Sequence, residues 1–597
     1  MMTRSKYFLL LSFVFIFLSY ACTDMLEEDK TPPTIDPEPI TPDLTAKIFT
    51  SVSGFATNEA GEPVSYAAVI VGDKQSTTDE YGYFKLSDVS VPEFAGQVKI
   101  TKLGYFESYK TFCPQENKEA FVRLQVWPRT TTGDVEAATG GATSTEDGAQ
   151  VTLPANGVVM ASTTPYTGVI HVNSRLIHPS TDNVLYENPG DARGINADGH
   201  AQALEIFSTV AVELTGSDGQ ALQLGEGKTA TIRLPIPTNL LADAPQTIDL
   251  WSFDTTTGLW KQEGSATKTG NNYEGTVPHF SFWAGAIGVP LVNFSARIVN
   301  TEGEPLAHVP VSVTIAGMPR NAGHGRFGYT DANGYVNGTV FANKDLVLDI
   351  LTPCALSAYE HEFSTTSADI DLGTLTGNLG QNVVTLSGTA QNCEGEPVAN
   401  GYVQTYDNGF YNRIAIVNGT FSFTGLVCTN TEVNLVAVDY ITYQQNEPQS
   451  VIIHPGVNAL GTLTTCGTST LGQIAYTIDG TTVTIQEPAD TIAAYLATPQ
   501  SIWTQVVTLS GDPNTNQQMA FQFNGGTQTG TDHTVSEVFS NAFPSGRGYW
   551  PVPITVTIAE YGEKGGFIRG SFSGNLLDFE DNSLHSFSCS FKVRRQN

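Results

Sequence analysis

One pattern of strands and turns occurs three times in this chain, and it constrains the fold more than any other feature. Each copy has an alternating apolar and polar run, a Gly-Glu-Pro triplet, a valine-rich run and a second turn that contains Gly. The triplets are Gly61–Pro63, Gly303–Pro305 and Gly395–Pro397. Alternation is typical of half-buried strands, Gly allows a positive φ, and Pro fixes φ on re-entry to the next strand. The repeat therefore predicts three antiparallel sandwiches of about 80 residues each.

The turns explain the polar residues of the repeat. Glu62, Glu304 and Glu396 stand inside the triplets, so we interpret them as turn residues and not as ligands. The second turn is Asp-x-x-Gly in the first two copies and Asn418-Gly419, without the aspartate, in the third. Together these features resemble the carboxypeptidase regulatory-like domain, a transthyretin-like β-sandwich common in Bacteroidetes surface proteins. The resemblance implies a spacer or docking module without chemistry of its own.

A different domain is expected between the first two copies, over residues 128–290. Its strand-like runs include Leu250–Asp254, Gly258–Lys261 and His279–Trp283. These resemble ZU5-type β-domains and the related region of cartilage intermediate layer protein. Trp251 and Trp260 flank a turn, so we expect them to pack against each other across two strands.

The tripeptide His279-Phe280-Ser281 suggests chemistry. Some ZU5 domains cleave themselves at His-Phe-Ser, between Phe and Ser. By that resemblance the Ser281 hydroxyl would attack the Phe280 carbonyl, and His279 would move the proton. The alternative, which we favour, is an ordinary edge strand with packed aromatic side chains and an exposed His279.

The N-terminus predicts export. Arg4 and Lys6 precede an apolar run of about a dozen residues, which suits a signal peptide and is too short to span a bilayer. Small residues at 19 and 21 precede Cys22, and this arrangement resembles a lipoprotein lipobox. We expect diacylglycerol and acyl groups on Cys22, although ordinary cleavage after Ala21 would give the same N-terminus without lipid.

The segment after Cys22 favours surface placement. It carries four acidic residues within eight positions and then five prolines by Pro42. The acidic patch resembles the surface-export signal of Bacteroidetes lipoproteins, and a solvated linker is the alternative. Proline stiffens the tether, which would lift the first domain off the membrane.

Composition narrows the partners and cofactors. The net charge is −31, which repels nucleic acid and argues against it as a partner. Carboxylate-rich loops are compatible with Ca²⁺, but no sequence feature specifies a site for it. No Cys-x-x-Cys, His-Glu-x-x-His, P-loop or Gly-x-Ser-x-Gly motif is present, so we predict no metal site, no cofactor and no enzymatic activity. Of the cysteines, Cys393, Cys428 and Cys466 fall in one domain, and we expect a disulfide among them, with buried free thiols as the alternative.

The C-terminal region is predicted to be a further β-domain. Gln473–Ile478 and Thr481–Gln486 form a hairpin across Asp479-Gly480. Trp503, Tyr549 and Trp550 are candidates for a platform that stacks on sugar rings, although packing in the core is the simpler interpretation.

The expected fold is all-β, with tandem β-sandwich domains arranged as beads on a string after a lipoprotein signal peptide. The domain plan is a signal peptide (1–21), a tether (22–46), a sandwich (47–127), a ZU5-like domain (128–290), two further sandwiches (291–380 and 381–467) and a C-terminal β-domain (468–597). We expect a non-enzymatic outer-membrane lipoprotein, exposed on the cell surface and held to the membrane by its lipid, for binding, adhesion or assembly of an envelope complex. The alternatives are a glycan-binding member of a nutrient-uptake system and a protein that cleaves itself between Phe280 and Ser281. A glycan or another surface protein is the expected partner.

Overall fold

The computed structural model describes residues 38–595, apart from short gaps at 66, 103, 179–183, 319–324, 354–355, 378, 380–381, 468–470, 488–490, 497–502, 510–517, 525–528, 542–546, 550–553, 563–565 and 579. Cys22, with the leader and most of the tether, lies outside the described residues. The predicted all-β fold of tandem sandwiches is confirmed, because the described residues form strands β1–β45 and one short helix, α1 (Val184–Glu187). None of the helical structure in these residues is long and apolar enough to cross a membrane.

The first two copies of the repeat have the same topology. The first sandwich contains β1 (Lys47–Thr57), β2 (Ala68–Val71), β3 (Lys74–Thr77), β4 (Tyr83–Pro92), β5 (Gly96–Thr101), β6 (Ser108–Phe112) and β7 (Glu119–Gln125). The second sandwich contains β21 (Leu291–Val299), β22 (Pro310–Ile315), β23 (Gly325–Tyr329), β24 (Tyr335–Phe341), β25 (Asp345–Leu351), β26 (Ser357–Ser364) and β27 (Ile370–Thr376). Their sheets run β4-β1-β7 with β3-β2-β5-β6, and β24-β21-β27 with β23-β22-β25-β26. In both, the first strand lies parallel to the last and antiparallel to the fourth.

The third copy keeps this plan in one continuous sheet. The third sandwich contains β28 (Val383–Gln391), β29 (Asn400–Tyr406), β30 (Asn412–Val417), β31 (Thr420–Leu426), β32 (Thr431–Asp439), β33 (Gln444–Gln445), β34 (Gln449–Ile453) and β35 (Gly456–Thr464). Its first strand, β28, again pairs in parallel with the last, β35. The two layers merge because Val417 pairs with Thr420 across the short Asn418-Gly419 turn, which replaces the longer Asp-x-x-Gly turn of the other copies.

The Gly-Glu-Pro turns have one geometry in all three copies. Gly61, Gly303 and Gly395 have φ between +76° and +82°, a region that glycine adopts without strain. The prolines each form a bridge back to the preceding strand. An asparagine three residues before each glycine accepts a hydrogen bond from the glutamate N–H at 2.8–2.9 Å; these asparagines are Asn58, Asn300 and Asn392. The geometry agrees with the interpretation of the glutamates as turn residues.

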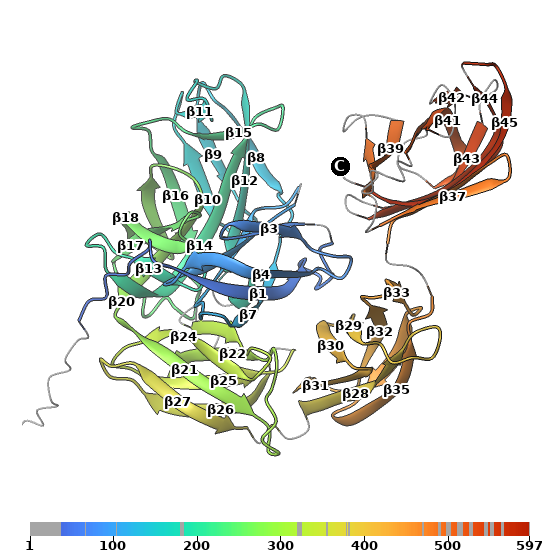
Figure 1. The fold of residues 1–597 in the computed structure, drawn as a ribbon. Helices are drawn as coiled ribbons and strands as arrows, with labels where there is room; N and C mark the ends of the chain where they lie inside the picture. Colours follow the sequence, from blue (N-terminus) through green and yellow to red (C-terminus); the bar gives the residue numbers. More distant parts are fainter. Residues whose placement is uncertain are drawn as a thin grey trace, which may run out of the picture.

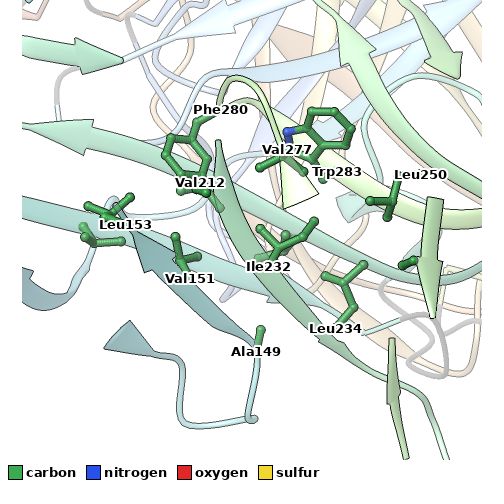
Figure 2. Packing of buried hydrophobic residues seen from close by; sticks show 14 of the residues in the cluster. Ala149, Val151, Leu153, Val212, Ile232, Leu234, Leu250, Val277, Phe280 and Trp283 are labelled. Atoms are coloured by element: carbon green, nitrogen blue, oxygen red, sulfur yellow. The ribbon is translucent and has the colours of Figure 1, made fainter. Parts of the chain in front are cut away.

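The middle domain forms a 13-stranded sheet. Its strands are β8 (Thr131–Glu136), β9 (Gly141–Ser144), β10 (Gln150–Leu153), β11 (Val158–Met160), β12 (Val169–Ile177), β13 (Arg193–Ile195), β14 (Ala201–Thr215), β15 (Ala221–Leu224), β16 (Ala230–Pro235), β17 (Thr247–Asp254), β18 (Leu259–Thr269), β19 (Asn272–Val277) and β20 (Phe282–Val289). Aliphatic side chains of this sheet pack around Phe280 and Trp283, as Figure 2 shows. Burial of this cluster stabilises the domain by removing apolar surface from water.

The expected cross-strand pairing of Trp251 with Trp260 is wrong, because the two residues do not stand opposite each other on β17 and β18. Both side chains are buried in one cluster, but the partner of Trp260 is Phe253, and Trp251 stands opposite Gln262. The turn sets this register, because Gly258 has φ +73° and Asp254 pairs directly with Leu259.

The C-terminal domain is a ten-stranded sheet. Its strands are β36 (Gln473–Ile478), β37 (Thr481–Gln486), β38 (Thr491–Leu496), β39 (Trp503–Leu509), β40 (Met519–Asn524), β41 (Gly530–Ser540), β42 (Arg547–Tyr549), β43 (Ile554–Tyr561), β44 (Phe567–Asp578) and β45 (Leu584–Arg594). The predicted hairpin across Asp479-Gly480 is present as β36–β37.

The three sandwiches and the middle domain are packed together and are not separate beads. In Figure 1 the first sandwich (blue) lies beside the middle domain (teal and green) and next to the second sandwich (yellow-green), which also contacts the middle domain. Hydrogen bonds cross these boundaries: Thr111 donates to Gly258 O at 2.5 Å, Asn337 to Cys113 O at 3.0 Å, and Ala307 N to Thr424 O at 3.2 Å. The units keep their tandem order along the chain, but the three sandwiches and the middle domain form one packed body.

A disulfide joins Cys393 to Cys466, with their Cα atoms 4.8 Å apart. These are two of the three cysteines among which we expected a bridge. Cys428 is also disulfide-bonded, whereas Cys113 and Cys589 are free thiols. Cys354 lies outside the described residues.

Candidate functional site

The His279-Phe280-Ser281 segment is a bend that connects β19 to β20. Pro278 stands at its start and cannot donate to a sheet ladder, so β19 ends at Val277. The next strand, β20, is hydrogen-bonded to β14 on one side and β17 on the other. The interpretation of this segment as an edge strand is therefore wrong, because the chain turns here and then enters the interior of the sheet.

His279 lies beside an acidic side chain on the neighbouring strand β18. Its Nε2 atom is 2.8 Å from Oε2 of Glu263. The same carboxylate accepts hydrogen bonds from Ser252 at 2.8 Å and from Lys261. Burial acts to raise the pKa of Glu263, but the hydrogen bonds from Lys261, His279 and Ser252 outweigh it and lower the pKa to about 2. At neutral pH the His279 imidazole therefore faces an ionised carboxylate.

The peptide bond between Phe280 and Ser281 is fixed on both sides. Gln223 accepts from Phe280 N at 2.8 Å and donates to Phe280 O at 3.0 Å. Val212 N donates to Ser281 O at 3.0 Å, and the indole of Trp283 donates to His279 O at 3.0 Å. These bonds satisfy the polar atoms of a bend whose Phe280 side chain enters the core.

The chemistry of this bend can be read from its hydrogen bonds. The Ser281 hydroxyl donates to Phe282 O at 3.2 Å, and the His279 ring is directed at Glu263. Gln223 lies where it would stabilise an oxyanion on the Phe280 carbonyl. Self-cleavage also needs a proton acceptor in contact with the Ser281 hydroxyl. The hydrogen bonds of these described residues do not supply one. Self-cleavage at Ser281, with His279 as its base, stays a prediction.

The aromatic platform proposed for sugar binding is only partly described. Trp503 is half-buried at the start of β39, and Tyr549 is on β42. Two strands, β40 and β41, stand between β39 and β42 in the sheet order. Trp550 lies outside the described residues, so the platform also stays a prediction.

The structure brings together a group of residues that sequence reasoning did not single out. Phe55 and Phe121 from the first sandwich, Tyr329 from the second and Tyr411 from the third share one cluster. The Arg123 guanidinium lies 5.2 Å from the Phe55 ring and donates to Tyr411 O at 2.6 Å. We call this group the sandwich junction, because it joins all three copies of the repeat.

A second arginine joins the first sandwich to the third. The Arg413 guanidinium lies 3.9 Å from the ring centroids of both Tyr83 and Tyr402. Its Nη2 atom pairs with Asp79, the aspartate of the Asp-x-x-Gly turn. Cation–π contacts of this kind are strongest where water is excluded, and the Arg413 side chain is only 12 % exposed.

Two buried arginines hold the middle domain to its neighbours. Arg193 pairs with Asp191 at 2.8 Å and reaches the backbone of the first sandwich at Phe94 O, 2.5 Å away. Arg326 of the second sandwich donates to Ala192 O at 2.6 Å and Asp191 O at 2.8 Å. Arginine suits such positions because its planar fork can serve several carbonyl acceptors at once.

Comparisons with known proteins find similarity to parts of the chain. No family model matches it. A 226-residue stretch is 24 % identical to human (Homo sapiens) cartilage intermediate layer protein 2 and covers 36 % of this chain and 19 % of that protein. The chain therefore matches about a fifth of that relative's length. This match supports the expected resemblance to cartilage intermediate layer protein over part of the sequence.

Solved structures of bacterial proteins, two of them pilins, are also similar in part. A minor pilin of Streptococcus agalactiae is 10 % identical, covering 30 % of this chain and 97 % of that one, with a TM-score of 0.14. The shaft pilin SpaA of Lactobacillus rhamnosus GG is 8 % identical, covering 30 % and 99 %, with a TM-score of 0.17. The Bacillus anthracis TIE protein is 8 % identical, covering 72 % and 66 %, with a TM-score of 0.13. TM-scores this low carry no argument about function.

Proposed function

We propose that this chain is a lipid-anchored, non-enzymatic protein of the bacterial cell surface. In this proposal Cys22 carries the lipid, and the packed sandwiches and middle domain form a rigid support. The C-terminal domain is then presented for binding, adhesion or assembly of an envelope complex.

The sandwich junction is the observation that carries this proposal. Its cation and rings join one unit to the next, because Arg123 contacts all three sandwiches. Beside the junction, Arg413 is enclosed by Tyr83 of the first sandwich and Tyr402 of the third. Burial of rotamer-rich side chains between units costs conformational entropy, which is recovered only if the units stay together. Such packing favours a rigid support over a chain of mobile modules.

The N-terminal sequence supports the anchor. The apolar leader, Cys22 after small residues and the acidic, proline-rich tether are arranged as in a surface lipoprotein. The carboxypeptidase regulatory-like and ZU5-like resemblances, and the partial likeness to cartilage intermediate layer protein 2, agree with a display role.

Protease accessibility on whole cells tests the proposal. The full chain and a Cys22→Ser variant are produced in a Bacteroidetes host, and intact cells are treated with an external protease before fractionation. We expect the wild-type chain to be in the detergent-soluble membrane fraction and to be digested from outside. The Cys22→Ser variant should be lost from the membrane.

A Cys589→Ser variant, which removes a buried free thiol, is the control and should behave like wild type. Equal membrane retention of wild type and Cys22→Ser would refute lipid anchoring at this residue.

A further inference from the structure

We propose that the C-terminal domain binds one divalent transition-metal ion of the zinc class through Asp578, Asp581 and His585. These side chains lie around the turn that joins β44 to β45. One ligand atom of each lies within 4.8 Å of the others. Ligands of a tetrahedral zinc ion are about 3.4 Å apart, so the exposed Asp581 side chain has to move only a short distance to close the set.

Asp578 supplies the independent reason to place an ion here. Its side chain is 0 % exposed. One carboxylate oxygen accepts a hydrogen bond from Glu580 N at 2.7 Å, but Oδ2 is buried without a hydrogen-bond partner. An unsatisfied buried carboxylate oxygen is costly because it has lost its water and gained nothing in return. A bound cation directly beside Oδ2 would satisfy it.

His585 is oriented in the way that metal-ligating histidines are. Its Nδ1 atom lies 2.6 Å from Oδ2 of Asp479, and the other oxygen of Asp479 accepts from Ser586 N at 2.8 Å. A carboxylate on one ring nitrogen fixes the orientation of the imidazole and presents the other nitrogen to the ion. That other nitrogen, Nε2, points toward the Asp581 side of the turn, where it lies 2.7 Å from the Ser583 hydroxyl.

The fold itself brings this group together. Asp479 belongs to the turn of the β36–β37 hairpin, and His585 is near the start of β45. Because β36 and β45 are paired antiparallel, this turn lies beside the start of β45. The Ser583 hydroxyl contacts both the His585 ring and the Asp581 carboxylate, 2.5 Å away, so the two side chains already converge on one point.

The ligand set selects the class of ion. Ca²⁺ and Mg²⁺ prefer sets made only of oxygen, with six or more ligands. An imidazole nitrogen with two carboxylates suits Zn²⁺ and its neighbours in the transition series. The partial exposure of His585 and the exposure of Asp581 leave a path for the ion to enter.

Calorimetric titration of the metal-free full chain with ZnCl₂, and separately with CaCl₂, tests the site. We expect one Zn²⁺ per chain, an upward shift in Tm on Zn²⁺ addition, and no comparable effect of Ca²⁺. Asp578→Asn and His585→Ala should each weaken Zn²⁺ binding at least tenfold. Asp479→Asn, which acts by positioning His585, should weaken it about 10–100-fold.

His454→Ala is the matched control, because His454 is exposed on another domain, and it should bind Zn²⁺ like wild type. Asp578→Asn keeps the shape of the side chain and the acceptor for Glu580 N, so this variant remains informative if His585→Ala does not fold. The proposal is overturned if wild type takes up no Zn²⁺, if Ca²⁺ binds more tightly than Zn²⁺, or if the Asp578→Asn and His585→Ala variants retain full affinity.

Discussion

His308 is a titratable side chain placed where units of the packed body meet. Its ring is stacked on Phe121 of the first sandwich, with centroids 3.9 Å apart. Its Nδ1 atom is buried without a hydrogen-bond partner. Burial, and then the positive charges of Arg123 and Lys85, lower the pKa of His308 to about 3. The folded protein therefore keeps this ring neutral well into the acidic range.

We predict that this histidine weakens the packed body in acid. The pKa of an unfolded histidine is about 6.5, so between pH 6.5 and about 3 the unfolded chain binds one more proton than the folded one. The free energy of unfolding then falls as the pH falls through this window, by at most about 1.4 kcal/mol per pH unit. Above pH 6.5 His308 has no such effect. Urea unfolding between pH 4 and 7 measures the slope.

The variant His308→Gln should lose this part of the pH dependence, while His454→Gln, at an exposed site, should keep it. Identical slopes for wild type and His308→Gln would contradict the assignment.

At the scale of the element, the third sandwich is closed by its disulfide. Cys393 follows β28, and Cys466 follows β35, the parallel partner of β28. The bridge therefore ties together the ends of the first and last strands of the copy.

We predict that this disulfide is a large contributor to the stability of the third sandwich. It closes a loop with a sequence separation of 73 residues. Restricting the unfolded chain over such a loop is worth about 4 kcal/mol. A double variant, Cys393→Ser with Cys466→Ser, should show a lower Tm for this unit by calorimetry. Cys113→Ser, which removes a free thiol, is the control for cysteine removal. A Tm unchanged in the double variant would argue against the bridge.

The sequence predicted best those strands that are joined by turns containing glycine or proline. The Gly-Glu-Pro triplets and Asp479-Gly480 predict their turns because positive φ at glycine and fixed φ at proline are local properties. The bend at Phe280 was harder to predict, since its alternating aromatic residues resemble a strand. Pro278 was the available signal that β19 must end. Register at Trp260 depends on the length of a turn and could not be read from the tryptophans alone.

Contacts between segments that lie far apart in the chain could not be predicted from the sequence. The zinc-class ligands come from the β44–β45 turn, and their supporting Asp479 comes from a hairpin about a hundred residues earlier. No local motif marks such a group, because the strand pairing of β36 with β45 creates it. The same holds for Arg123, whose three partners belong to three different sandwiches.

At the scale of the whole molecule, the packed arrangement depends on a few cations. Arg413 exemplifies this: it joins the first and third sandwiches through two rings and Asp79. Removing one partner of a largely buried cationic contact leaves the others unsatisfied and costs about 3 kcal/mol.

We predict that a double variant, Arg123→Ala with Arg413→Ala, loosens the body without unfolding its sandwiches. The radius of gyration from small-angle X-ray scattering should increase, while the circular dichroism of the sheets stays unchanged. Arg233→Ala, at an exposed position of β16, should leave the radius as in wild type. If the double variant scatters like wild type, the contacts of Arg123 and Arg413 do not hold the units together.

The intact mass of the protein, extracted from membranes with detergent, distinguishes a lipid-anchored, uncleaved chain from one that cleaves itself. We measure the wild-type chain and Ser281→Ala side by side. We expect a single acylated chain that begins at Cys22 in both. An N-terminus without lipid would contradict the anchor. Two fragments that meet at Phe280 and Ser281 in wild type, and are absent from Ser281→Ala, would contradict the non-enzymatic account and identify a protein that cleaves itself.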